Sequence, residues 1–221
     1  MLYKTKGIVF RFTRFGETSI VVNIFTSMFG LQSYIVNGIR TSSSKSKIAL
    51  YQPLTLLDLV VYHRENANIL RIKEVLCYYA YQTLTQHPIK SAQAMFLNEV
   101  LNKCVKEQSH AEELYDFISN DLIALDQLDV NPNFHLLFLL KLSKHLGFGP
   151  QNTMEILGGR MLEVQEEAAL EQMIASDYQS NMKVTVEQRR NLLDAMIQFY
   201  AAHIDSFGEI KSVNVLRTIL S

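Results

Sequence analysis

The spacing of apolar residues changes once along this chain of 221 residues, near residue 80. Before that point, apolar and polar residues alternate in short runs that end at glycines, which is the period of half-buried strands. After it, apolar residues recur every three or four positions, as in helices packed against a core. The sequence therefore predicts a multi-domain α+β fold, with a β module over residues 1–80 and an all-α module over residues 81–221.

The net charge of the chain changes at the same place. Residues 1–82 contain ten Lys/Arg and four Asp/Glu, a net charge of +6, whereas residues 83–221 contain eleven and eighteen, a net charge of −7. A basic surface on a small β domain is typical of proteins that bind a polyanion, most often nucleic acid. We therefore expect the β module to bind nucleic acid and the acidic helical module to have another task.

Five runs in the first module have the pattern of strands, and short turns connect the first three as a meander. A sheet this small leaves exposed edges unless it closes into a barrel. The five-stranded oligonucleotide-binding barrel, or OB-fold, is the common solution at this size, so we expect one here. The predicted strands are residues 6–14, 18–26, 31–37, 54–63 and 69–76.

Helix-start signals replace these turn signals in the second module. They are Pro88, a capping box at 109–112, the Asn131-Pro132 pair and a second capping box at 185–188. The helix predicted from residue 132 to residue 146 is apolar on most sides, so we expect it at the centre of the helical module. Residues 151–184 have the weakest helical pattern. Arg189 and Arg190 fall near a predicted helix start, where positive charge is disfavoured, so we expect Glu187 and other acids, or a bound anion or partner, to compensate it.

The strongest candidates for phosphate contacts lie in the loop expected between the third and fourth strands. This loop is rich in Ser and Lys and contains Arg40, Lys45 and Lys47. Cations and hydroxyl groups can bind phosphate oxygens without requiring a particular base. A merely solvated loop is the alternative. Further candidates in the same module are Lys6, Arg11, Arg14, Arg71 and Lys73, with Lys4 as an additional cation. The aromatic candidates for base stacking are Phe15, Tyr34 and Tyr51, although small barrels also bury such residues.

A second candidate site lies on the predicted central helix. Phe138, Lys141, Lys144 and His145 cluster on one face, as a basic and apolar spot in an acidic module. This cluster could receive an acidic peptide with an apolar end. The alternative is that these cations only complement the dipole at the C-terminal end of the helix.

Sequence patterns of enzymes and metal sites are missing. The chain has no HExxH, GxSxG or phosphate-loop motif, and Cys77 and Cys104 belong to no CxxC pair. We therefore expect no catalytic residues, no cofactor, no metal site and two buried thiols. The most apolar run, residues 134–140, is far shorter than the ~20 residues of a membrane span. With no apolar leader at its N-terminus, the protein is expected to be soluble and cytoplasmic.

Several motifs together resemble the RecO family of bacterial recombination mediators. They are Lys4-Thr-Lys-Gly-Ile-Val, Phe15-Gly-Glu-Thr-Ser, Thr26-Ser-Met-Phe-Gly-Leu, the Gly38-Ile-Arg to Lys45-Ser-Lys loop, Leu50-Tyr-Gln-Pro-Leu and His145-Leu-Gly-Phe-Gly-Pro. The resemblance implies a nucleoid-associated protein whose barrel binds single- and double-stranded DNA and anneals complementary strands. It also implies a helical domain that contacts the acidic tail of the single-stranded-DNA-binding protein, and joint action with RecR in loading the RecA recombinase.

The sequence departs from many members of that family after Pro150, where they carry a four-cysteine zinc module. Residues 151–167 contain no Cys, so the chain resembles zinc-free members. Two other functions remain open at this point. The barrel of an interaction adaptor would bind protein instead of DNA, and an enzyme acting on DNA would need clustered carboxylates with a divalent metal.

Overall fold

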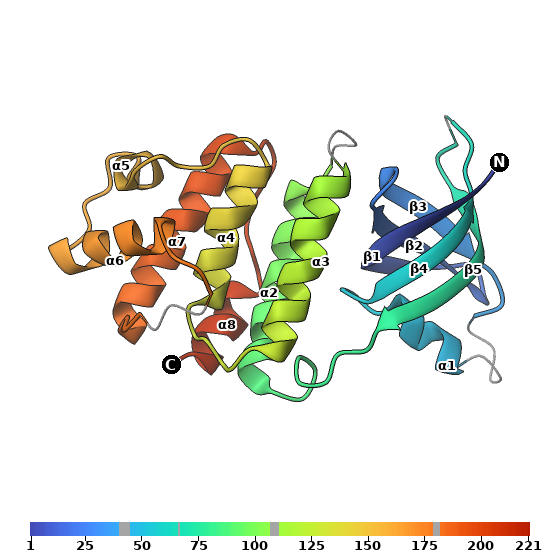
Figure 1. The fold of residues 1–221 in the computed structure, drawn as a ribbon, viewed down its shortest axis with the longest axis horizontal. Coiled ribbons are helices and arrows are strands. Elements are labelled where there is room, and N and C mark those ends of the chain that lie inside the picture. Colours follow the sequence, from blue (N-terminus) through green and yellow to red (C-terminus); the bar gives the residue numbers. More distant parts are fainter. Residues whose placement is uncertain (40–44, 66, 107–110, 179–181) are drawn as a thin grey trace. The chain divides into compact units, whose positions relative to one another are not determined.

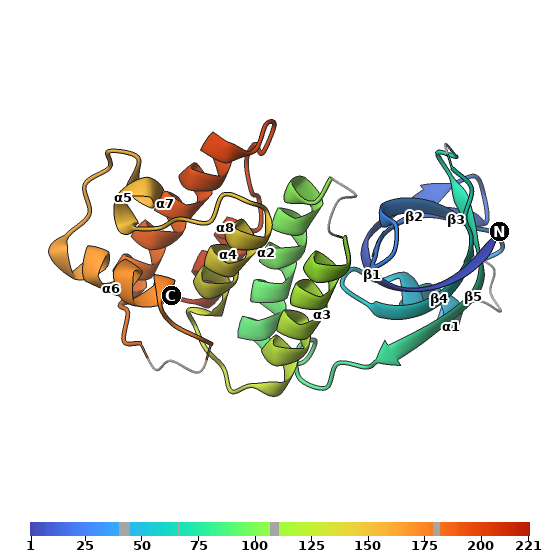
Figure 2. The same ribbon diagram turned by 45° about the horizontal axis from the view of Figure 1, so that its top comes forward.

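The computed structural model describes residues 1–39, 45–65, 67–106, 111–178 and 182–221, and it divides into two compact units. Figures 1 and 2 show the chain as a ribbon. The barrel unit comprises Met1–Gln82 and Val105–Ile123, and the helical unit comprises Thr83–Cys104 and Ala124–Ser221. The division of the chain into functional domains at residue 80 remains a prediction.

Five strands form a closed barrel in the order β1, β2, β3, β5, β4. This barrel, followed by helices, confirms the predicted fold class. Neighbouring strands are antiparallel except β3 and β5, which are parallel. The first strand is longer than predicted because its first half pairs with β4 and its second half with β2. The strands are β1 (Leu2–Phe15), β2 (Ser19–Thr26), β3 (Gly30–Val36), β4 (Leu56–Tyr62) and β5 (Leu70–Tyr79).

Side chains that alternate along the strands fill the barrel. Ile20, Val22 and Ile24 of β2 are fully buried in this core. Between β3 and β4 the chain forms α1 (Lys45–Ile48) and a short 3₁₀ helix, η2 (Ala49–Tyr51), and it packs Ile48 and Tyr51 on the same core. The prediction of a loop over residues 37–47 is therefore wrong at residues 45–47, which belong to α1, because these two apolar side chains hold the segment against the barrel.

Two predicted helix starts are confirmed. Pro88 begins α2, where its fixed backbone angle suits the first helical position. At the start of α7, the Thr185 hydroxyl accepts a hydrogen bond from the Gln188 amide at 3.2 Å and the Gln188 side chain accepts one from the Thr185 amide at 3.0 Å. The capping box at 109–112 falls partly outside the described residues. The helices are α2 (Pro88–Cys104), α3 (Ala111–Gln127), α4 (Phe134–His145), α5 (Thr153–Leu157), α6 (Val164–Ile174), α7 (Val186–His203) and α8 (Val213–Ile219).

Helix α4 is the centre of the helical unit, as predicted. Its residues from Phe134 to Leu140 are all buried, and it packs against α2, α6 and α7. The prediction of two buried thiols is wrong, since both are only half-buried. Cys77 lies at the margin of the barrel core near the end of β5, and Cys104 is the last residue of α2.

Candidate nucleic-acid interface

Four neighbouring strands of the barrel align outward-facing side chains in a row. Val21 of β2 pairs with Thr13 of β1 and with Ile35 of β3, and Ile35 pairs with Arg71 of β5. A second row lies two residues away along β2. Because these positions alternate with the buried residues of the core, their side chains point away from it. The two rows together form a surface that we call the arginine face: Arg11, Thr13, Val21, Asn23, Ser33, Ile35 and Arg71.

The arginine face combines positive charge with neutral hydrogen-bonding groups. Arg11 and Arg71 are exposed, and neither β2 nor β3 contains an Asp or Glu. Adjacent strands lie about 4.8 Å apart, so the row from Thr13 to Arg71 extends about 14 Å across the barrel. A phosphate chain that crosses both rows of the arginine face meets two guanidinium groups and no carboxylate of β2 or β3.

A groove of about 790 Å³ lies elsewhere on the barrel unit, between strands β1, β4 and β5 and the first turns of α3. Lys6 on its floor is directly opposite Asp58, and the Lys6 ammonium is 5.1 Å from the centre of the Tyr78 ring. Acids outnumber lysines in this groove, which makes it unfavourable for a phosphate chain. We call it the acidic groove, and its charged lining is Lys4, Lys6, Asp58, Glu74, Glu112 and Asp116.

Two tyrosines hold α3 beside the acidic groove. The hydroxyl groups of Tyr78 on β5 and Tyr115 on α3 are 2.9 Å apart and share a hydrogen bond. Burial raises the pKa of Tyr78 and raises that of Tyr115 further, so both hydroxyls stay protonated at neutral pH. This uncharged contact between two tyrosines holds α3 in place, and with it Glu112 and Asp116 at the groove.

The structure places the predicted cations of the strands in different surroundings. Arg11 and Arg71 lie on the arginine face, and Arg14 lies beside it at the end of β1, opposite Ile20. Lys6 lies in the acidic groove. Lys73 is near Arg71 along β5, but its ammonium is 3.4 Å from the Glu74 carboxylate. The structure thus brings the arginines together and gives the two lysines acidic neighbours.

The loop cations are only partly described. Arg40 lies outside the described residues, as does the side chain of Lys45. Lys47 is exposed on α1, one residue before Ile48, which packs on the barrel core. The segment that leads to Arg40 starts beside the turn between β1 and β2, because the Ser19 hydroxyl donates a 3.0 Å hydrogen bond to Asn37 Oδ1.

The aromatic candidates separate by burial. Tyr34 and Tyr51 belong to the barrel core, with 0% and 3% of their surface exposed, whereas Phe15 is 52% exposed. An aromatic cluster that we did not predict joins Tyr3, Phe29 and His63, with the rings of Phe29 and His63 stacked at 3.8 Å. Its members are 26 to 60 positions apart in the sequence, so no local pattern could have indicated the cluster.

The predicted peptide-binding residues of α4 also differ in exposure. Phe138 is fully buried and offers no surface to a ligand, because it faces the interior of the helical unit. Lys141 is half-buried, and its ammonium donates a 2.9 Å hydrogen bond to the Asp177 carboxylate. That hydrogen bond holds the pKa of Asp177 below its usual value. Lys144 and His145 are exposed at the end of the helix.

The described residues contain no group of three or more His, Cys, Asp or Glu side chains placed to hold a metal ion. Residues 151–167, which lack Cys, form α5 and the beginning of α6. Within the described part of the chain, every helix is too short or too polar to cross a membrane.

Comparison with known proteins assigns both halves of the chain to one family. Residues 1–81 match the family described as Recombination protein O N terminal, and residues 86–212 match Recombination protein O C terminal. The chain belongs to the RecO family. Proteins named DNA repair protein RecO from Flavobacterium johnsoniae and Phocaeicola vulgatus are 34% and 30% identical to it, over 100% of both chains in each case. The RecO protein of Christiangramia forsetii is 31% identical over 99% of both chains.

Membership of the RecO family confirms the resemblance found in the sequence and gives the chain a role in DNA repair. The matches cover the barrel strands as well as the helices from α2 to α7. The arginine face, the acidic groove and the end of α4 are therefore features of a RecO-family protein.

Proposed function

We propose that this RecO-family chain is a non-enzymatic mediator of recombinational DNA repair that works in the cytoplasm at the nucleoid. It binds single- and double-stranded DNA, anneals complementary strands and, with RecR, helps to load RecA on DNA covered by the single-stranded-DNA-binding protein. The arginine face is the observation that best supports DNA binding. Its contacts are suited to phosphates and need no particular base, so binding tolerates any sequence.

Annealing follows from the same electrostatics. Two complementary strands repel one another through their phosphates, and cationic side chains that neutralise phosphates release counterions and lower this repulsion. Arg11, Arg14 and Arg71 supply such charge on the strands, and Arg40, Lys45 and Lys47 supply it from the adjoining segment. The bases stay accessible because the contacts are to the backbone.

The barrel offers a charge-matched pair of variants for testing the DNA-binding surface. We expect Arg11→Gln/Arg71→Gln to weaken binding of single-stranded DNA for all sequences and to lower the slope of log K against log salt by about 1.4, since two phosphate contacts are lost. Lys4→Gln/Lys6→Gln removes the same charge from the acidic groove and should bind nearly as the wild type does. Fluorescence anisotropy at several salt concentrations measures both. Equal losses in the two variants would contradict the arginine face as the binding surface.

The loop cations are tested in the same titration. An Arg40→Gln/Lys45→Gln/Lys47→Gln variant should lower the slope by up to about 2.1, and an annealing assay with strands covered by the single-stranded-DNA-binding protein should slow correspondingly. Unchanged affinity and slope would reject the loop residues as phosphate contacts.

The acidic tail of the single-stranded-DNA-binding protein is proposed to bind at the end of α4, through Lys141, Lys144 and His145. The positive charge at the C-terminal end of this helix supports the proposal, within a module whose net charge is otherwise negative. Phe138 is buried, so another residue must receive the apolar end of the tail.

A second candidate function is that of an adaptor whose barrel binds protein. The acidic groove favours it, because Leu76 on its floor is 65% exposed and is surrounded by acids that repel DNA. Stoichiometric protein binding with little salt dependence, together with no binding of DNA, would support the adaptor. Turnover of labelled DNA would instead indicate an enzyme.

A further inference from the structure

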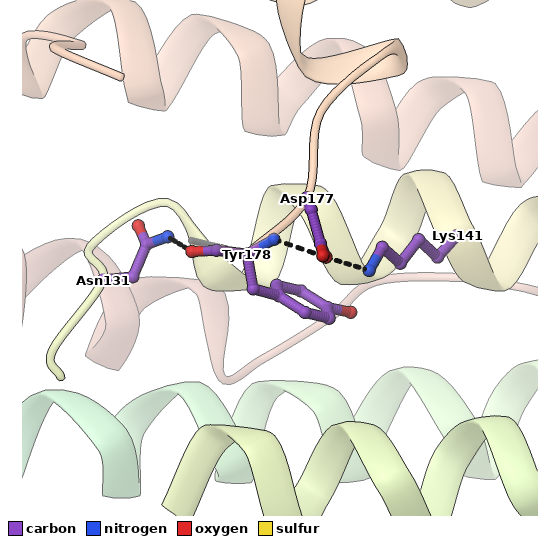
Figure 3. Close-up of polar contacts among 4 residues, drawn as sticks. All are labelled: Asn131, Lys141, Asp177 and Tyr178. Carbon is purple, nitrogen blue, oxygen red and sulfur yellow. Dashed lines mark hydrogen bonds and ion pairs between the residues drawn. The ribbon is translucent and has the colours of Figure 1, made fainter. Parts of the chain in front are cut away.

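A short segment after α6 lies on α4 in the manner of a bound peptide. Its two residues are Asp177, whose side chain is 77% exposed, and Tyr178, which is buried. Figure 3 shows Asp177 reaching the Lys141 ammonium while the Tyr178 backbone passes Asn131. The segment is 36 positions from Lys141 along the chain, so tertiary structure alone brings them together.

The contacts of this segment involve the Asp177 carboxylate and the amide, carbonyl and ring of Tyr178. The Asp177 carboxylate accepts hydrogen bonds from Lys141 Nζ at 2.9 Å and from the Tyr178 amide at 2.7 Å. The Tyr178 carbonyl accepts one from Asn131 Nδ2 at 2.8 Å. The Tyr178 ring stacks on Phe134 with centroids 4.2 Å apart, and the Lys141 ammonium lies 3.7 Å from the centre of that ring. The ring is thus in contact with an aromatic ring and with a cation.

The receptor residues are suitably arranged on α4. Phe134 and Lys141 are seven positions apart, which places them two turns apart on the same face of the helix. Phe134 is 1% exposed, and the Tyr178 ring contributes to covering it. A segment that replaced Asp177 and Tyr178 would therefore find a cation for its carboxylate, an aromatic surface for its ring and an amide donor for its backbone.

We infer that Asn131, Phe134 and Lys141 form a binding site for an acidic peptide with an aromatic residue next to the acid, and that Asp177-Tyr178 is its intramolecular occupant. This inference rests on the proposed contact between α4 and an acidic tail, and it replaces Phe138 with Phe134 as the apolar partner. An exposed ion pair adds little net stability, so a competing carboxylate can displace Asp177. The peptide then binds at the cost of releasing the internal segment, which lowers its apparent affinity.

The test uses the full chain and a fluorescein-labelled probe peptide, Gly-Ser-Asp-Asp-Asp-Phe, in fluorescence anisotropy. We expect Asp177→Asn to bind this probe about two- to fivefold more tightly than the wild type, since the internal competitor is weakened. Asp205→Asn, which removes the same charge from an exposed position after α7, should leave the affinity unchanged. Lys141→Gln should bind several times more weakly.

A second variant distinguishes displacement of the internal segment from the purely electrostatic effect of removing the Asp177 charge. Tyr178→Ala keeps the charge and opens the surface of Phe134, so it should tighten binding of the probe with Phe but not that of a probe ending in Ala. A melting curve verifies that Tyr178→Ala folds. If Tyr178→Ala does not fold, Asp177→Asn provides the test, because its substitution is at an exposed side chain.

The possible outcomes distinguish this inference from the proposed function. If the probe binds the wild type and requires Lys141 or Lys144, but Asp177→Asn does not tighten binding, the internal occupant is rejected and the peptide contact stands. If Lys144→Gln, measured in the same assay, weakens binding but Lys141→Gln does not, the site is rejected while α4 remains the docking helix. If the probe binds neither the wild type nor Asp177→Asn, both the inference and the proposed contact are rejected.

Discussion

At Gly7, the barrel interior has no room for even one additional carbon atom. A Cβ at this position would lie 2.5 Å from Ile24 Cγ2 and 2.8 Å from Leu59 Cδ1. We expect Gly7→Ala to lower the free energy of unfolding by about 1–3 kcal/mol, because the core must shift to admit the methyl group. Urea unfolding measures the change, with Ser33→Ala on the outer surface of β3 as the control. An unchanged midpoint for Gly7→Ala would contradict the packing described for this strand.

His135 is an ionisable side chain buried inside the helical unit. It is 0% exposed, and its ring nitrogens have no hydrogen-bond partner in the described part of the protein. Burial, assisted by the positive charge of Arg189, lowers the pKa of His135 to about 3. The folded protein therefore keeps this ring neutral at pH values where the unfolded chain binds a proton.

This difference in proton binding predicts a pH-dependent stability. Between pH 7 and pH 5 only the unfolded state gains the proton, so the wild type should lose about 2 kcal/mol of stability relative to His135→Phe, which cannot titrate. Above pH 7 the free energy of unfolding of the wild type and that of His135→Phe should depend on pH in the same way. Urea unfolding across this pH range provides the measurement, and His203→Gln, at an exposed position, should follow the wild type. Parallel curves for His135→Phe and the wild type below pH 6.5 would reject the prediction.

Single residues were the hardest to place from the sequence. Arg189 was recognised as a cation near a helix start that needs compensation, but the predicted source was Glu187 and other acids, or a bound anion or partner. The structure instead buries it and directs its guanidinium to Asn133 Oδ1 and to the carbonyls of Val184 and Leu220. Two of these acceptors are 56 and 31 positions away, so no local pattern could indicate them.

Between elements, a buried lysine joins α2 to the end of α3. Lys90 is 4% exposed, and its ammonium donates to the Thr83 hydroxyl at 2.8 Å and to the carbonyls of Asp126 and Leu128 at 2.8 and 2.6 Å. These carbonyls lie at and just beyond the last turn of α3, where helices leave acceptors without an intrahelical partner. All three protons of the ammonium are used.

We expect Lys90→Met to lower the free energy of unfolding by about 2–4 kcal/mol, because it leaves buried acceptors without a donor. Lys211→Met, at an exposed position, is the matched control and should have little effect. Chemical denaturation of both variants provides the measurement. A similar stability for the two would mean that the carbonyls at the end of α3 find other donors.

Elements with a local signal were predictable, and those stabilised by distant partners were not. Pro88 and the capping box at Thr185 indicated α2 and α7 correctly. Helix α6 was missed as a clear helix because it starts after Glu163 rather than Ser or Thr, and the Glu166 carboxylate accepts a hydrogen bond from the Glu163 amide. The helix in the serine- and lysine-rich segment was missed because Ile48 and Tyr51 are stabilised by the barrel core and not by their neighbours.

For the whole molecule, the charge split changes once the chain is folded. Residues 105–123 carry one Lys and five Asp/Glu into the barrel unit, so its net charge is +2 instead of the +6 of residues 1–82. Two of these acids line the acidic groove, in which Lys4 and Lys6 also lie. The sequence indicated a basic barrel correctly, but strand register was needed to locate a face on which the positive charge is not opposed.

The parallel ladder between β3 and β5 has the fewest residue pairs of the barrel, with only Tyr34–Leu70 and Ile35–Arg71 among the described residues. A seam with so few backbone hydrogen bonds is where the barrel opens most easily by local fluctuation. Arg71 lies on this seam, within the proposed path of DNA. A bound DNA strand would bridge β3 and β5 and thus shift the equilibrium between the open and closed forms of the barrel toward the closed form, by mass action.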